Sequence, residues 1–274
     1  GGALYISLCD YSTADIINTT ISGNQTCSGS GGAAGGSGGT GGNGGASSIS
    51  TANGGVGGNG GDGLLGNPSG DAGGIYFYLP HSVANLIFDT IVNNSSPSGS
   101  SSAGAAGAGG AGGYGSDGTQ ADSGASGLPG AGSRESISGG IELKDYGEVR
   151  LKNSILAGNN ADTGPDCYGM ISSQEYNLVG DTSSCNIGSS TYDLYDDDAL
   201  PLNLGPLSIN FGNLMTHAVL PGSVAMNYIP YGANGCGTTY TTDQRGFYRP
   251  LNNACDIGAY ESGHLFSFLS LVSR

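Results

Sequence analysis

The sequence predicts an all-β fold, a right-handed parallel β-helix whose coils are interrupted by glycine-rich insertions, and two observations support it. Three segments of about 20 to 25 residues resemble one another, and each holds two short β-rich runs, which is the length of one coil of a β-solenoid. Glycine-rich tracts separate these segments, and glycine supplies 55 of the 274 residues. The alternative is a β-sandwich in which the similarity is accidental.

The three similar segments span residues 1–24, 73–94 and 139–159, and their alignment predicts four columns. The columns are Ile17, Ile87 and Leu151; Asn18, Phe88 and Lys152; Thr19, Asp89 and Asn153; and Ile21, Ile91 and Ile155. Residues two apart in a strand share a face. We therefore expect the first, third and fourth columns to face inward, and the second, which has no common character, to face solvent. Parallel crossovers are right-handed in nearly all cases, so we expect a right-handed coil.

The insertions, residues 28–72 and 97–138, are dominated by Gly, Ser and Ala, a composition typical of flexible linkers. Their glycines nevertheless keep a three-residue register, with Gly-Gly-X triplets at 35–46, 54–62 and 109–114. An extended helix with three residues per turn would let such glycines touch backbone to backbone. The insertions are therefore expected to form irregular loops or packed bundles, which would resemble the polyglycine-II bundles of some antifreeze and phage adhesin proteins.

Composition restricts the partners. Lys and Arg total 7 against 22 Asp and Glu, so the formal net charge is −15. This balance argues against binding nucleic acid and anionic membranes, which need a basic surface, and suits a secreted protein. The longest apolar stretch, Leu265 to Val272, is too short to span a membrane. No signal peptide is present, which indicates a processed or partial chain.

The six cysteines fall into three consecutive pairs of similar spacing, which predicts three local disulfides made in an oxidising compartment. The predicted pairs are Cys9–Cys27, Cys167–Cys185 and Cys236–Cys255. A metal site and free buried thiols are the alternatives. The three histidines, His81, His217 and His264, lie far apart in the sequence, which disfavours the metal site.

A series of motifs follows residue 150: Gly-Pro-Asp-Cys at 164–167, Tyr-Asn-Leu-Val-Gly at 176–180, Asp-Gln-Arg-Gly at 243–246 and Cys-Asp-Ile-Gly-Ala-Tyr-Glu at 255–261. Over residues 150–261 this series resembles bacterial surface proteins with a parallel β-helix and a choice-of-anchor Q domain. The resemblance implies an exported protein attached to the cell envelope by its C-terminal tail, and no catalytic residues carry over. The chain departs from the pattern at 224–227, where relatives usually have Pro-Ala-Ile-Asp.

The expected organisation has three parts: β-helix coils at 1–165 with both insertions, the C-terminal end of the β-helix at 166–262, and an apolar tail at 263–274. Five charged residues in the motifs are expected to pair and cap the last coil. They are Asp243, Arg245, Arg249, Asp256 and Glu261.

The coils offer no cluster of carboxylates with Lys, Arg or His, so we expect no catalytic residues and no enzyme activity. No cofactor is expected beyond weak calcium binding. Its candidates are the acidic run Asp193, Asp196, Asp197 and Asp198 and the calcium-roll matches at 57–65 and 112–117. The alternative for the acidic run is a solvated turn, and the alternative for the two calcium-roll segments is a chance match.

Four asparagines stand in N-x-S/T sequons, which indicates a possible glycoprotein, although chance matches are common in such a chain. They are Asn18, Asn24, Asn93 and Asn94.

The tail has high β propensity and would be an aggregation hazard if left free in water. Its apolar residues are Leu265, Phe266, Phe268, Leu269, Leu271 and Val272. We expect the tail to add to a neighbouring subunit, and its alternatives are folding back onto its own domain or being the remnant of a membrane anchor. The expected function is therefore a structural subunit of an extracellular filament or cell-surface layer that assembles with itself, head to tail. A surface adhesin that binds glycans is the second reading, and a polysaccharide-degrading enzyme the third.

Overall fold

The computed structural model describes residues 2–27, 35–37, 56, 58–62, 71–97, 105–114, 116–117, 119–130, 136–188, 190–195 and 201–263. They belong to two compact units. Unit 1 contains Gly1–Thr26, Asp71–Ser96 and Ile137–Arg274, and unit 2 contains Cys27–Gly70 and Pro97–Ser136, which are the glycine-rich insertions.

Unit 1 is built on three parallel sheets. The first contains β1 (Leu4–Ser7), β4 (Ile75–Tyr78), β7 (Ile141–Leu143) and β10 (Cys167–Tyr168). The second contains β2 (Thr13–Ile17), β5 (Val83–Ile87), β8 (Glu148–Lys152) and β11 (Ile171–Ser173). The third contains β3 (Thr20–Ser22), β6 (Thr90–Val92), β9 (Ile155–Ala157), β12 (Leu178–Val179) and β13 (Leu194–Tyr195).

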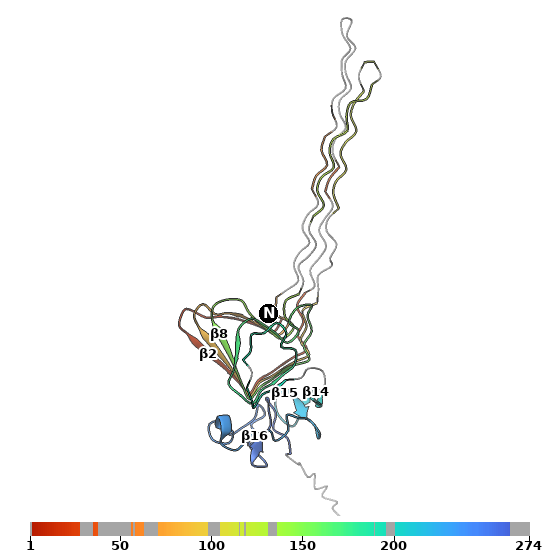
Figure 1. Cartoon of the computed structure of the whole chain (residues 1–274). Helices are drawn as coiled ribbons and strands as arrows, with labels where there is room; N and C mark the ends of the chain where they lie inside the picture. The colour runs from red at the N-terminus through yellow and green to blue at the C-terminus, as the bar shows by residue number, and fades with distance from the viewer. Residues whose placement is uncertain are drawn as a thin grey trace, which may run out of the picture. The chain divides into compact units, whose positions relative to one another are not determined.

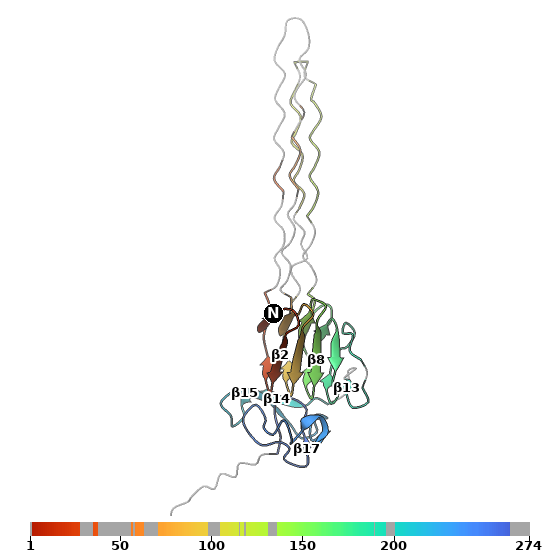
Figure 2. The same ribbon diagram turned by 90° about the vertical axis from the view of Figure 1, so that its left-hand side faces the viewer.

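Each turn of the chain contributes one strand to each sheet in turn, which confirms the predicted parallel β-helix and rules out a sandwich. Figure 1 shows the three sheets end on, and Figure 2 shows β2, β8 and β13 following one another along the stack. Both insertions leave between the third strand of one coil and the first strand of the next.

Apolar side chains that point inward from all three sheets fill the coil. The core includes Ile75, Phe77, Leu86, Ile91, Leu151 and Leu156, all without exposed surface. Burial of each such side chain is worth roughly 1.5–3 kcal/mol, so the stacked columns supply most of the driving force for coiling.

The predicted alignment is correct between the first two coils and wrong by one residue in the third. Ile17 pairs with Ile87, as expected, but Ile87 pairs with Lys152, and Leu151 pairs with Leu86. Likewise Ile91 pairs with Leu156, not with Ile155. Because a shift of one residue reverses the face, the inward column of the second sheet is Ile16, Leu86 and Leu151. Ile17 and Ile87 point outward.

The column predicted to face solvent is a bend. Asn18, Phe88 and Asn153 occupy equivalent positions at the corner between the second and third sheets, with φ of 53°, 55° and 53°. Asn adopts this left-handed conformation readily, but Phe does not. Phe88 is nevertheless fully buried, so packing from outside the coil must hold it there.

That packing comes from residues 201–263, which we call the buttress. It contains the antiparallel pair β14 (Leu204–Ile209) and β15 (Met215–Val219), the pair β16 (Ile229–Pro230) and β17 (Ala254–Cys255), and the 3-10 turn η1 (Ala233–Gly235). A second apolar core joins the buttress to the outward faces of the coils, and it includes Ile87, Phe88, Ile155, Ala225 and Ile257.

Unit 2 contains extended glycine runs joined backbone to backbone. The amides of Gly107 and Gly110 donate to the carbonyls of Gly61 and Gly58, at 2.9 and 2.7 Å. Donors on one run are therefore spaced by three residues, and the reversed order of their acceptors makes the two runs antiparallel. No described glycine of unit 2 has a positive φ, as a three-residue left-handed helix requires. This is the polyglycine-II arrangement expected from the Gly-Gly-X register.

Candidate functional site: the buttressed corner and the open first coil

The buttress binds the coils along their corner. Asn18 Nδ2 donates to the carbonyl of Thr242 at 3.0 Å in the first coil, and the amide of Ala259 donates to Thr90 Oγ1 at 2.9 Å in the second. In the third coil, Asn153 accepts a hydrogen bond from the amide of Gly258 at 2.8 Å. The contacts therefore span three successive coils, and the buttress acts as a brace along the stack.

The five charged motif residues form the centre of this brace. Arg245 and Asp243 form an ion pair at 2.6 Å, with side chains 1% and 0% exposed. Arg249 Nε lies 3.9 Å from Glu261 Oε2, and both side chains are completely buried. Four of the five residues pair as predicted, but the prediction that the group caps the last coil is wrong. They lie against the corner bend, where Arg249 stacks 4.1 Å from the Phe88 ring centroid.

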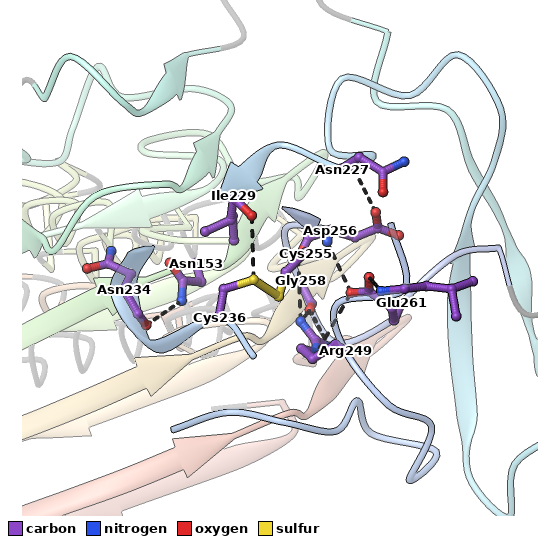
Figure 3. Close-up of a disulfide and its surroundings, with 11 residues drawn as sticks. Asn153, Asn227, Ile229, Asn234, Cys236, Arg249, Cys255, Asp256, Gly258 and Glu261 are labelled. Atoms are coloured by element: carbon purple, nitrogen blue, oxygen red, sulfur yellow. Dashed lines mark hydrogen bonds and ion pairs between the residues drawn. A yellow bond between two sulfur atoms is a disulfide. The ribbon is translucent and has the colours of Figure 1, made fainter. Parts of the chain in front are cut away.

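Backbone groups satisfy most of the remaining charge in this cluster (Figure 3). Glu261 accepts the amides of Leu251 and Asp256 at 3.2 and 3.1 Å, and Asp256 accepts the amide of Asn227 at 2.7 Å. Burial raises the pKa of Glu261, and Arg249 opposes that shift. The Cys236–Cys255 disulfide fixes the strand that leads into this network. The arrangement has the character of a structural lock, because backbone amides occupy its carboxylate oxygens.

Two of the three predicted disulfides are present, Cys167–Cys185 and Cys236–Cys255. The third prediction is wrong, because Cys9 and Cys27 are free and exposed. Cys9 follows β1, whereas Gln25 lies beside Gly2 at the other end of that strand. The four-residue strand separates these corners by roughly 13 Å, and a disulfide needs Cα atoms within about 7 Å.

A thiol reagent applied to the native protein should therefore modify Cys9 and Cys27 and leave the other four cysteines unmodified. Mass spectrometry of the digested protein measures this, and labelling after reduction and unfolding should reach all six. A Cys9–Cys27 linked peptide in the unreduced digest would show that the two corners come together after all.

Two ladders of polar side chains run along the stack, and sequence analysis found only part of one. Thr19 donates its amide to Asp89 Oδ1, Asp89 to Ser154 Oγ, and Ser154 to Asn177 Oδ1, at 2.8 to 3.0 Å. The second ladder runs in the same way through Asn24, Asn94, Asn159 and Asp166. In both, a side chain of one coil accepts the bend amide of the preceding coil. Each ladder thus satisfies buried amides that no sheet can pair.

Hydrogen bonding and burial determine which asparagines of the four sequons are accessible to a glycan. Asn94 is 1% exposed and donates its Nδ2 to Ile21 O and Asn159 Oδ1, so it is not accessible to a glycan. Asn18 and Asn24 both use Nδ2 in hydrogen bonds, to Thr242 O and Asn94 Oδ1. Asn93, by contrast, is exposed.

The outer edge of the first coil is open. Within the residues that the structure describes, no strand pairs with the free sides of β1, β2 and β3. Leu4 and Ile17 are 38% and 42% exposed there, whereas their partners Ile75 and Ile87 are buried. No described donor reaches Asn24 Oδ1, the position where a preceding coil would place its amide.

The opposite end of the stack is partly covered. The Cys167–Cys185 disulfide holds the returning chain against the last coil, and Gly169 pairs with Cys185. Ile187 and Tyr195 then pack against the end of the apolar core. The two ends of the β-helix therefore differ in how much of the apolar core is covered. The first coil exposes Leu4 and Ile17 beside its three unpaired strands, whereas Ile187 and Tyr195 cover the core at the other end, although β11 and β13 also lack an outer partner among the described strands.

Glu142 is a buried carboxylate that sequence analysis missed. It stands in register between Tyr76 and Tyr168 on the outward side of the first sheet, and neither carboxylate oxygen has a hydrogen-bond partner. Burial, with a smaller contribution from Asp71, raises its pKa to about 7.

This group should make stability fall as the pH rises. In the unfolded chain the pKa of Glu142 is about 4.3, so the folded state binds the proton more tightly. The stability that Glu142 contributes by binding this proton is fully present below about pH 4.3 and is lost as the pH rises through about 7. At pH 8, Glu142→Gln should raise the free energy of unfolding, by on the order of 3 kcal/mol, with little effect at pH 4. Thermal unfolding across this range measures it. Glu148→Gln is the control, because hydrogen bonding to Arg150 lowers the pKa of Glu148; equal pH profiles for wild type and Glu142→Gln would contradict the prediction.

The two described histidines, His81 and His217, have different surroundings. His81 is exposed beside Asp10, at 3.8 Å. His217 is buried, with Nδ1 2.7 Å from Gly205 O and Nε2 2.8 Å from Ser22 Oγ. A carbonyl oxygen only accepts hydrogen bonds, so Nδ1 of His217 carries the proton. Through its bond to Ser22, His217 connects β15 to β3. His264 lies outside the described residues.

The calcium candidates are only partly described. Asp193 is buried and accepts the amide of Asn177 at 2.8 Å, and Asp117 bonds Thr119. Asp196, Asp197, Asp198 and parts of the segments 57–65 and 112–117 lie outside the described residues, as does the whole apolar tail from 264. In the part of the chain that is described, no three His, Cys, Asp or Glu side chains gather as metal ligands.

These features define a parallel β-helix protein with a braced corner, an open first coil and two disulfides, the kind of bonds that form in an oxidising compartment. The chain matches no protein-family model, no curated protein and no solved structure. The resemblance of residues 150–261 to the choice-of-anchor Q proteins therefore stays a hypothesis. Among the described residues, no helix has the length and apolar character needed to cross a bilayer.

Proposed function

We propose that this chain is a structural subunit of an extracellular filament or cell-surface layer, and that subunits join at the open edge of the first coil. The observation that carries the proposal is the open first coil, where three strands lack an outer partner and Leu4 and Ile17 are exposed. Sheet edges that expose apolar side chains and unpaired backbone groups are templates for another strand. A contact between such an edge and a different surface of the next copy is heterologous, and it generates filaments when rotation does not close it.

The apolar tail at 263–274 is the donor that we propose for this edge. A short strand of high β propensity supplies the amides and carbonyls that β1, β2 or β3 leave unpaired. The exported location follows from the same proposal, since two disulfides and an acidic composition suit a surface protein. An adhesin that holds glycans is the second candidate, and it is favoured by the recess described in the next subsection.

The test compares an edge variant with a matched control. Ile17→Lys places a charge on the open edge, whereas Leu207→Lys changes a residue of similar exposure, 39% against 42%, on β14 of the buttress. Assembly, seen by negative-stain microscopy and light scattering, should be lost in Ile17→Lys and on removal of residues 263–274, and kept in Leu207→Lys. A wild-type chain that stays monomeric at high concentration, or a truncated chain that polymerises normally, would refute the proposal.

A further inference from the structure

A polar recess of about 310 Å³ lies on the outward face of the second sheet, against the buttress. Its floor consists of side chains from three coils in register: Asp15 pairs with Asn85, and Asn85 with Arg150. Asn85 Nδ2 donates to Asp15 Oδ1 at 2.6 Å, which leaves the amide oxygen of Asn85 available as an acceptor. Gln174 extends the floor toward the fourth coil.

The recess gathers positive charge in an acidic protein. The described residues include five Lys and Arg, and two of them, Arg245 and Arg249, are buried in the buttress cluster. Of the remaining three, Arg150 and Lys152 both line this recess. Arg150 and Lys152 stand two residues apart on β8 and therefore share its outward face. The recess has one lining carboxylate, Asp15, against these two cations, so it is suited to an anionic group.

Lys152 is the cation available to a ligand. Arg150 is engaged with Glu148 at 2.7 Å, but no described carboxylate forms an ion pair with Lys152. The Lys152 ammonium lies 5.4 Å from the Tyr240 ring centroid, and burial lowers its pKa. A partly desolvated ammonium without a counter-ion gains more from an added carboxylate than one in bulk water does.

The walls of the recess place a second requirement on its ligand. Ile87 and the Tyr240 ring give the recess an apolar side, and Asp15, Asn85 and Gln174 give it hydrogen-bonding groups. A ligand that satisfies both sides has an apolar face, several hydroxyls and one negative charge. We propose that this recess binds a carboxylated sugar ring of an acidic glycan, with its carboxylate on Lys152, its hydroxyls on the floor and its ring against Tyr240. The net charge of −15 does not exclude this, because charges more than about 8 Å away are screened at physiological salt.

Calorimetric titration of the full chain with a galacturonic acid tetramer tests this inference independently of assembly. Lys152→Met should weaken binding about tenfold or more, the loss expected for one charged hydrogen bond. Lys152→Arg should retain most of the affinity. Lys144→Met is the control, because Lys144 is an exposed lysine of the same unit outside the recess, and it should bind as wild type does.

Two further probes separate the sugar from its charge. A neutral hexose tetramer and acetate should each bind at least tenfold more weakly than the acidic tetramer, and added salt should weaken the acidic tetramer further. Equal binding of acetate would reduce the recess to a simple anion site and overturn the inference. No measurable binding of the acidic tetramer, or binding that Lys152→Met leaves unchanged, would overturn it as well.

Discussion

Gly109→Ala should disrupt unit 2 while unit 1 stays folded. A Cβ at Gly109 would collide with the carbonyl oxygen of Gly124, which is backbone and has no rotamer by which to move away. The neighbouring hydrogen bond from the amide of Gly124 to Gly110 O, 2.8 Å long, would then be lost. Overpacking of this kind costs typically about 1–3 kcal/mol. Apart from backbone bonds, the run that contains Gly124 is held by the side chains of Asn59 and Asp62, which offer little to offset that cost. Hydrogen exchange of the amides in 105–130 should accelerate by one to two orders of magnitude.

Gly36→Ala is the matched control for Gly109→Ala, because a Cβ at Gly36 meets nothing within 4 Å. The amide of Gly61 donates to Gly36 O at 2.7 Å, and that bond does not depend on the Cα hydrogen. Exchange in the Gly36→Ala protein should match wild type. If both alanines behave alike, close approach of glycine backbones is not what holds the unit together.

Arg249→Met should be the most damaging single change in the buttress. It leaves Glu261 buried without its ion-pair partner and removes the cation that stacks on Phe88. Breaking one side of a buried pair costs about 3–5 kcal/mol. We therefore expect a drop of this size in the free energy of unfolding, measured by denaturant titration.

Arg150→Met is the control for Arg249→Met. Arg150 pairs with Glu148 at the surface, where the Arg side chain is 43% exposed, and such pairs contribute about 1 kcal/mol or less. The double change Arg249→Met with Glu261→Gln should recover part of the loss, since it removes the unpaired charge. A loss no larger for Arg249→Met than for Arg150→Met would show that the buttress does not depend on its buried ions.

The sequence predicted the architecture because the coil is a local, repeated pattern. Columns such as Ile21 and Ile91 were correctly aligned, and two disulfides were correctly expected. For the insertions the sequence left packed bundles and irregular loops as alternatives, and the described glycine runs favour the bundle. The third coil was misaligned because Leu151, Ile155 and Leu156 permit two registers one residue apart, and the β period distinguishes them only when the buried face is known.

The candidate site was harder to predict because it depends on which outward faces are covered. Phe88 was assigned to solvent, since a bend that packs against a distant segment has no local signal. Glu142 was missed, and Asn94 was assigned only a possible glycan, for the same reason: their burial comes from neighbours far away in the sequence. Lys152 received no role from the sequence either. Its significance appears only when Asp15, Asn85 and Tyr240 are brought beside it.

The position of the insertions has a consequence for folding. Every residue of the second coil pairs with a residue of the first about 70 positions earlier, as Ile17 does with Ile87. Closing a loop of that length costs chain entropy before any pairing can repay it, and chains with such high contact order fold slowly. The two arms of the first insertion meet, as the bond from the amide of Gly61 to Gly36 O at 2.7 Å shows. Hydrogen bonding within the bundle therefore brings the ends of successive coils together. This shortens the conformational search that must precede strand pairing between the coils.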